Sequence, residues 1–151
     1  MFDNTTGIRN TAVGTEALLN NNTTQDCVAV GYRAAYTNEQ NYMTAVGAYC
    51  LYSSGTGTLN TGLGYYTGYN VTSGSNNTLL GNQAGGSLTT GGAETHVGNY
   101  AGYHVTTGGG TGYNTSLGYA SNYKLTEGYY NVAIGAFSLY HNITGHHNQA
   151  F

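Results

Sequence analysis

Few side chains in this sequence could carry acid–base or nucleophilic chemistry. Its 151 residues include six carboxylates, at Asp3, Glu16, Asp26, Glu39, Glu94 and Glu127. Catalysis by paired carboxyl groups requires both groups within several ångström of each other, and these six share no common spacing along the chain. The chain also contains no Gly-x-Ser-x-Gly motif, no phosphate-binding loop and no zinc-site spacing of Cys and His. The sequence therefore predicts a protein that is not an enzyme and holds no cofactor.

The side chains suited to metal or thiol chemistry are equally few. In a trimer, a histidine near the axis would be present three times and could hold a transition metal. The simpler interpretation is a polar residue on a solvated face, which suits His104 and His141 best, and we predict no metal site. Cys27 and Cys50 fall at different points of neighbouring repeats, so we expect two buried free thiols instead of a disulfide. The histidines are His96, His104, His141, His146 and His147.

The composition narrows the class of partner. Charged residues make up 6% of the chain and Lys plus Arg number three, which leaves no basic surface for a phosphate backbone. No stretch approaches the ~20 apolar residues of a membrane-spanning helix, and the N-terminus lacks the features of a secretory signal. We therefore expect no nucleic-acid binding and no membrane insertion. Many of the 16 tyrosines recur in register, which argues against disorder.

An internal repeat dominates the chain, and its period of ~17 residues is typical of a solenoid whose repeats stack on one another. The repeated element is a pentapeptide that ends in an aliphatic residue and Gly. The intervals between the closing glycines are equal, except that the second is one residue shorter and the sixth is three residues longer. The pentapeptides are NTAVG (10–14), CVAVG (27–31), MTAVG (43–47), NTGLG (60–64), NTLLG (77–81), ETHVG (94–98), NTSLG (114–118) and NVAIG (131–135).

Each repeat is numbered here from position 1, four residues before its glycine. Position 4 is aliphatic throughout and position 2 is Thr or Val, which predicts a short strand with positions 2 and 4 on the core face and the small position 3 pointing outward. The glycine at position 5 is expected to permit a positive φ or a close approach between rungs. These two predicted structural columns are Val13, Val30, Val46, Leu63, Leu80, Val97, Leu117 and Ile134, and Gly14, Gly31, Gly47, Gly64, Gly81, Gly98, Gly118 and Gly135.

A second strand is expected after the glycine corner. Position 8 is small, position 11 is polar and position 12 is often apolar, so we expect positions 8, 10 and 12 to face inward and position 11 to face outward. Position 10 is usually Tyr, with Leu19 and Gly86 as exceptions, and predicts a ladder of stacked rings. The ladder residues are Tyr36, Tyr52, Tyr69, Tyr103, Tyr123 and Tyr140.

The predicted fold is all-β, a β-solenoid or β-roll of about eight and a half rungs, each of ~17 residues. Residues 1–9 would form a cap or linker, and residues 10–151 a single repeat domain whose last repeat is truncated. The inner column is thin and position 9 is often small, so the roll is expected to bury a further face against copies of itself. We predict a parallel homotrimer.

Tyrosines just after the glycine corner are the best candidates for receptor contact. They would sit at an edge of the roll, where a ring can stack on a sugar while its hydroxyl stays in water; packing between chains is the alternative. The sixth repeat carries three extra residues within TTGGGTGY (106–113), and an insertion in a solenoid forms a surface loop. The candidates are Tyr32, Tyr49, Tyr65, Tyr66, Tyr100, Thr111, Tyr113 and Tyr119, with Phe137 beside them.

The NTAVG opening, the aromatic-rich middle and the TTG turn at 89–91 resemble repeats of bacteriophage tail fibres and tail spikes, often found ahead of a self-cleaving chaperone domain. The chain is also similar to the head repeats of trimeric autotransporter adhesins, but its period is longer and it has a tyrosine column. The phage resemblance implies a virion or otherwise extracellular location, a homotrimer and contact with a bacterial surface glycan or protein. The fragment NQAF (148–151) matches the start of a ninth repeat, so the parent protein is expected to continue.

The leading functional prediction is a non-enzymatic attachment protein, either the shaft or the receptor-binding segment of a tail fibre. An ice-binding solenoid is an alternative, because position 2 is Thr in six of eight repeats and strands repeat every ~4.8 Å. Against this alternative, the residue two places along is aliphatic. A subunit of an extracellular adhesive filament is a third possibility, since stacked strand edges can add further copies.

Overall fold

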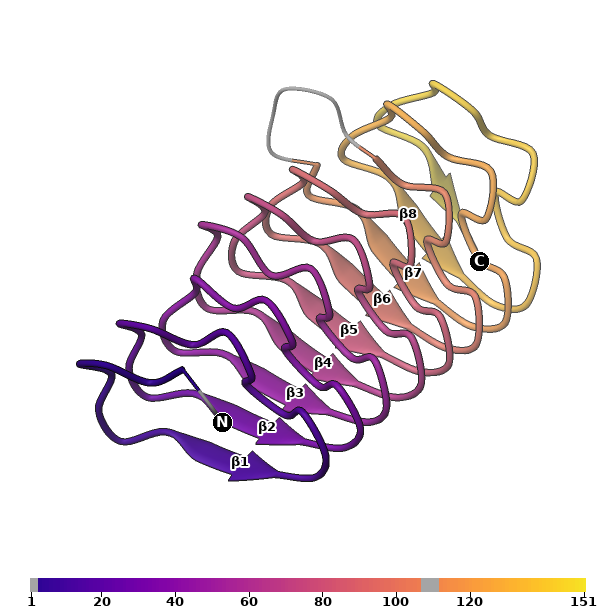
Figure 1. The fold of residues 1–151 in the computed structure, drawn as a ribbon. Coiled ribbons are helices and arrows are strands. Elements are labelled where there is room, and N and C mark those ends of the chain that lie inside the picture. Colours follow the sequence, from indigo (N-terminus) through magenta and orange to yellow (C-terminus); the bar gives the residue numbers. More distant parts are fainter. Residues whose placement is uncertain (1–2, 107–111) are drawn as a thin grey trace.

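The computed structural model describes residues 3–106 and 112–151 and shows a parallel β-solenoid (Figure 1). One sheet runs the length of the described chain, and its nine short strands pair in sequence order. The strands are β1 (Thr11–Val13), β2 (Val28–Val30), β3 (Thr44–Val46), β4 (Thr61–Leu63), β5 (Thr78–Leu80), β6 (Thr95–Val97), β7 (Thr115–Leu117), β8 (Val132–Ile134) and β9 (Gln149–Ala150). The N-terminus lies at one end of the stack and the C-terminus at the other.

The strand register confirms the repeat. Val13 pairs with Val30 and Leu63 pairs with Leu80, so residues one repeat apart lie directly above each other. The described residues contain no helix, and the predicted all-β solenoid with one rung for each repeat is confirmed. The rungs are counted here from one to eight by their first residues, Asn10, Cys27, Met43, Asn60, Asn77, Glu94, Asn114 and Asn131.

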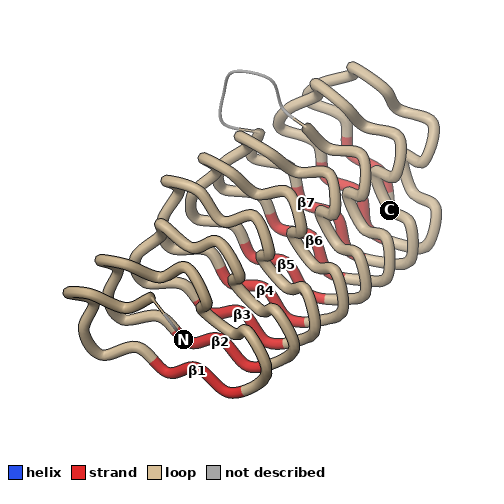
Figure 2. Tube along the Cα trace, viewed as in Figure 1, coloured by secondary structure: helices blue, strands red, loops and turns tan. Residues whose placement is uncertain are grey.

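The predicted second strand is absent from the described residues, where only one strand forms in each rung (Figure 2). Positions 8–12 form turns because positions 7 and 9 adopt left-handed backbone conformations, as at Glu16 (φ 58°) and Leu18 (φ 48°). Two left-handed residues within three positions cannot belong to an extended strand. Burial of positions 8 and 12 and exposure of position 11 nevertheless hold in most rungs, but position 9 is buried in place of position 10, whose tyrosines are only half-buried.

The prediction that positions 2 and 4 face the core was wrong. The exposed fractions of Val13, Leu63, Leu117 and Ile134 are 56%, 51%, 44% and 36%, and the remaining position-4 residues are half-buried. Position 3 faces inward instead, and Ala29, Ala45, Gly62, Leu79, His96, Ser116 and Ala133 are buried there. Alternation shows which residues share a face of a strand, but the small size of position 3 was mistaken for a sign of exposure.

The core is a complementary pairing of position 3 with position 9. The two positions are never both large in one rung: Ala45 occurs with Leu51 and Leu79 occurs with Gly85, while rung four has glycine at both, Gly62 and Gly68. A Cβ atom on Gly85 would lie 2.9 Å from a methyl carbon of Leu79, so the glycine makes room for the leucine. In rung four, Leu51 and Leu79 from the neighbouring rungs fill the space, since a Cβ atom on Gly68 would lie 2.7 Å from each.

Buried asparagines at position 1 join the rungs. Asn60 Oδ1 accepts the Asn77 N–H at 3.0 Å, and Asn77 Oδ1 accepts the Glu94 N–H at 2.9 Å. Within its own rung, Asn60 donates from Nδ2 to the Gly74 carbonyl at 2.8 Å. One side chain thus satisfies a buried donor of the next rung and a buried acceptor of its own, which favours Asn over an apolar residue here.

The glycine corner behaves as predicted. Gly64 has φ +136°, and a Cβ atom added to it would lie 2.6 Å from the carbonyl oxygen of Gly81 in the next rung. Both reasons for glycine, the positive φ and the close backbone approach, therefore apply at Gly64.

Candidate functional site

A carboxylate, an imidazole and a hydroxyl meet inside the solenoid. His96 Nε2 lies 3.5 Å from Glu94 Oε2, and His96 Nδ1 lies 3.0 Å from Ser116 Oγ. This order resembles that of hydrolase triads. All three residues are fully buried, with no exposed surface, and a nucleophile must be reached by its substrate. The cluster is therefore a polar network of the core, and sequence analysis missed it because the three residues lie in two different rungs.

Burial decides the charge of this network. It raises the pKa of Glu94 to about 8, although hydrogen bonds from Asn114 favour the carboxylate. It lowers the pKa of His96 to about 4. At neutral pH the two groups are therefore an un-ionised acid and a neutral imidazole.

The cysteines match the expectation of buried free thiols. Cys27 and Cys50 are both free and buried. Burial raises the pKa of the Cys50 thiol to about 12, so this side chain stays protonated and is a poor nucleophile.

The position-10 tyrosines form the expected stacked ladder on one side of the solenoid. Ring centroids are 5.0 Å apart for Tyr36 and Tyr52, and 4.9 Å apart for Tyr52 and Tyr69, with nearly parallel planes. A second run joins Tyr103 to Tyr123 at 5.6 Å and Tyr123 to Tyr140 at 5.1 Å. Gly86 separates the two runs because it contributes no ring at position 10 of rung five.

The corner tyrosines at positions 6 and 7 gather into an aromatic edge with the same interruption. In rungs two to four, Tyr49 contacts Tyr32 and Tyr66 with centroid distances of 5.2 and 4.7 Å. Tyr65, which is 50% exposed, lies 4.5 Å from Tyr66. In rungs six to eight, Tyr100, Tyr119 and Phe137 form the second group. Rung five places Asn82 and Gln83 between the two groups.

The candidates on the insertion do not join this edge. Tyr113 sits before its strand, at position 17, where it stacks on Tyr130 at 5.0 Å. Tyr130 in turn contacts His147 at 5.1 Å. This second aromatic cluster, which also contains Tyr129 and His146, was not predicted. Thr111 lies outside the described residues.

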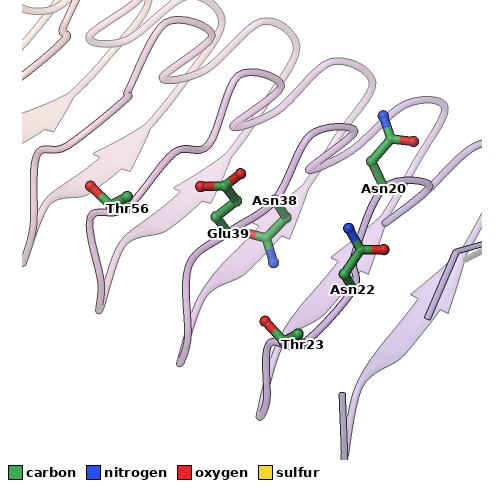
Figure 3. A pocket seen from close by; sticks show the side chains of 6 residues that line it. All are labelled: Asn20, Asn22, Thr23, Asn38, Glu39 and Thr56. Atoms are coloured by element: carbon green, nitrogen blue, oxygen red, sulfur yellow. The ribbon is translucent and has the colours of Figure 1, made fainter. Parts of the chain in front are cut away.

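A polar hollow opens at rung two, which is one residue shorter than its neighbours. The missing residue falls in the turn around Glu39, between the longer turns of the flanking rungs. The hollow has a volume of about 380 Å³, and Figure 3 shows amide, hydroxyl and carboxylate side chains around it. Its lining residues are Asn20, Asn22, Thr23, Asn38, Glu39 and Thr56.

An aromatic hollow of about 220 Å³ opens at rung five. Its walls are the tyrosines on either side of the missing ring, and amide side chains stand beside them. Gly86 and Gln83 were not predicted as site residues, although Gly86 was visible as an exception in the tyrosine column. The lining residues are Tyr66, Tyr69, Asn70, Gln83, Gly86 and Tyr103.

Comparisons with protein-family models, curated proteins and solved structures find no match to this chain. Among the described residues no helix could cross a membrane, and no group of three or more His, Cys, Asp or Glu side chains is arranged to hold a metal ion.

Proposed function

We propose that this chain is a non-enzymatic attachment segment, the shaft or receptor-binding part of a phage tail fibre or a comparable extracellular fibre, which binds a bacterial surface glycan or protein. The observation that carries the proposal is the aromatic edge. Tyr32, Tyr65 and Tyr119 are 40%, 50% and 46% exposed on a scaffold whose rungs are joined by hydrogen bonds. Partly exposed tyrosines offer a flat apolar ring and a wet hydroxyl, which suits them to binding surfaces.

Binding of the labelled chain to bacterial cells, together with a glycan array, tests the proposal. We expect saturable binding to at least one bacterial surface, and weaker binding by the Tyr65→Ser/Tyr119→Ser double variant. Both rings are about half exposed, so this variant should still fold, and its melting temperature is measured as the control for folding. Absence of binding to every cell type and glycan would leave only the shaft interpretation and would overturn receptor binding.

We also propose that the chain acts as a parallel homotrimer whose contacts include the outer face of the sheet. The position-4 residues give this face an aliphatic column along the whole solenoid, and three of them, Val13, Leu63 and Leu117, are more than two-fifths exposed. Self-association would remove that column from water, and this burial would stabilise the assembly by about 25 cal/mol for each Å² of apolar surface.

An ice-binding solenoid remains the second candidate, because the strand geometry turns position 2 outward. Thr11, Thr61 and Thr78 are exposed on the same flat sheet face, where parallel strands repeat every ~4.8 Å. Their outward neighbours two residues along are aliphatic, which gives each rung one threonine instead of two. Thermal hysteresis of the purified chain would support this function, and its absence would exclude it.

A further inference from the structure

We propose that the aromatic hollow at rung five is a binding site for one neutral hexopyranose unit. This inference rests on the proposed function, because it assigns the glycan contact to a defined site. The proposed ligand is a sugar ring and not a protein side chain or a flat aromatic compound.

The first argument is the shape of the hollow. In the tyrosine ladder, each ring covers the face of the next, but rung five supplies no ring between Tyr69 and Tyr103. Tyr66 lies over Tyr69 at 4.8 Å with planes 17° apart, and both rings line the hollow from rung four. Tyr103 lines it from rung six, where its ring packs close to Gly86. The hollow is thus lined by aromatic rings from two rungs, and an aromatic surface suits the apolar C–H face of a pyranose.

The second argument is hydrogen bonding. Asn70 donates from Nδ2 to the Gly86 carbonyl at 3.0 Å, and Gln83 donates from Nε2 to the Tyr100 hydroxyl at 3.3 Å. Both amides are thereby oriented, and no described residue donates to Asn70 Oδ1 or Gln83 Oε1. Two oriented acceptors beside an aromatic wall suit the hydroxyl donors of a sugar, whereas a flat hydrocarbon ring would leave them unused.

The third argument is charge. None of the six lining residues carries a charge, in contrast to the polar hollow at rung two, which contains Glu39. A charged sugar such as a sialic acid would lose hydration on entering without gaining an ion pair. The chemistry of the lining therefore favours a neutral hexose or N-acetylhexosamine.

The structure also provides a variant that closes the site. Gly86 has no positive φ, and a Cβ atom there would lie 2.8 Å from the Tyr103 ring and 3.3 Å from the Gln83 carbonyl oxygen. That ring lies 5.6 Å from Tyr123, compared with 4.9 Å between Tyr52 and Tyr69, so it has room to move back. Gly86→Tyr should therefore complete the ladder and fill the hollow while the fold is kept.

The matched control uses the other exception in the same column. Leu19→Tyr adds a ring next to Tyr36 at rung one, where it closes no aromatic hollow. A second site variant, Gln83→Ala, removes one acceptor; Ala120 occupies the same left-handed position in rung seven with φ 51°, so alanine is compatible with the backbone.

Saturation-transfer NMR of the full chain tests the inference. The probes are the methyl pyranosides of glucose, galactose and mannose, N-acetylglucosamine, sialic acid, and p-cresol as a flat aromatic compound. We expect saturation transfer to at least one neutral sugar and none to sialic acid. The signal should disappear in Gly86→Tyr, remain in Leu19→Tyr, and require roughly 3- to 10-fold more sugar in Gln83→Ala, the loss of one hydrogen bond.

Equal sugar signals in the parent chain and Gly86→Tyr would overturn the inference, as would binding of p-cresol without any sugar, or no binding of any probe. If Gly86→Tyr does not fold, the Gln83→Ala titration decides. Cell binding by the same variants separates the inference from the proposed function. Cell binding that survives in Gly86→Tyr shows that this hollow is not the glycan contact of the attachment function, whereas a parent chain that binds no cells refutes the receptor-binding function.

Discussion

Left-handed residues shape every rung at positions 7, 9 and 17. They include side chains such as Leu18 (φ 48°), Tyr66 (φ 55°) and Asp26 (φ 58°), for which a positive φ costs roughly 1–2 kcal/mol relative to the right-handed region. Neighbouring rungs hold these residues in place, because the Leu18 N–H bonds the Ala34 carbonyl at 3.0 Å and the Tyr66 N–H bonds the Ala48 carbonyl at 3.1 Å. An isolated rung is therefore not expected to keep this conformation.

Gly64→Ala should destabilise the solenoid through two separate effects. The positive φ costs about 1–3 kcal/mol, and the contact with the Gly81 carbonyl adds about 1–3 kcal/mol of overpacking. Gly135→Ala is the matched control: its φ is +114°, but no atom lies within 4 Å of the added Cβ. Urea unfolding should therefore show a larger loss for Gly64→Ala, and equal losses would contradict the contact between rungs.

The Glu94–His96 pair predicts a pH optimum of stability. The folded pKa of Glu94 is about 8 against an ordinary 4.5, so its contribution is present below pH 4.5 and is lost as the pH rises toward 8. The folded pKa of His96 is about 4 against 6.5, so its contribution is lost as the pH falls below 6.5. Between pH 4.5 and 6.5 the two dependences cancel.

Thermal melts should accordingly show the highest melting temperature between pH 4.5 and 6.5 and a decline from pH 6.5 to 8. Glu94→Gln removes the group that titrates in the alkaline range and should flatten that decline. If the decline keeps its slope in this variant, Glu94 does not cause it.

At the scale of the rung, side-chain hydrogen bonds supplement the short strands. The strand occupies only three residues in each of rungs one to eight. The ladder of asparagines therefore supplies further hydrogen bonds between neighbouring rungs. Glu94 continues this ladder in rung six, where its Oε2 accepts the Asn114 N–H at 3.1 Å. Rungs two and three have Cys27 and Met43 at position 1 in place of Asn. Other side-chain hydrogen bonds occur beside them, including one from Asn60 Nδ2 to Gln40 Oε1 at 2.9 Å.

Asn77→Ala should cost roughly 2–4 kcal/mol of unfolding free energy, because it leaves the Glu94 N–H and the Gly91 carbonyl without their side-chain partner. Asn148→Ala serves as the control: within the described chain, Asn148 bonds back to Asn131 and is half-buried at the last rung. Chemical denaturation of both variants measures the difference. Similar losses would mean that the ladder contributes little beyond its own rung.

At the scale of the molecule, the sheet face and the aromatic edge have different proposed partners. The sheet face carries an uninterrupted aliphatic column, which suits another copy of the same chain. The aromatic edge is broken at rung five and mixes rings with amides, which suits a polar ligand. This division agrees with a fibre that assembles through one face and binds through another.

Sedimentation equilibrium tests the assembly. The parent chain should have the mass of three copies, and Leu63→Lys/Leu117→Lys should shift it toward one copy, because two charges per chain would have to be buried. Thr72→Lys/Thr144→Lys places the same charges at exposed turns and should remain trimeric. A monomeric parent chain at micromolar concentration would refute the homotrimer, and open-ended polymers in electron micrographs would favour a filament.

The stacking of residues one repeat apart, the glycine corner and the tyrosine ladder were predictable from sequence, because each depends on a column that recurs at a fixed spacing. A periodic column constrains neighbours in a solenoid directly. The aromatic edge was also anticipated, since its tyrosines follow the corner glycines in several rungs. Glu94 with His96, and the hollow at Gly86, were missed because each occurs once, and contacts of a single rung have no period to reveal them.

What the amino-acid sequence determined by itself was therefore the period, the all-β class and the residues that share a column. Only the tertiary structure decided which side of each column faces the core. Period-two alternation is symmetric, and Val13 and Ala12 exchange faces if the strand is turned over. The width of the roll breaks that symmetry: positions 3 and 9 both point into the core and are never both large in one rung, so the core has no room for the branched residues of position 4 as well.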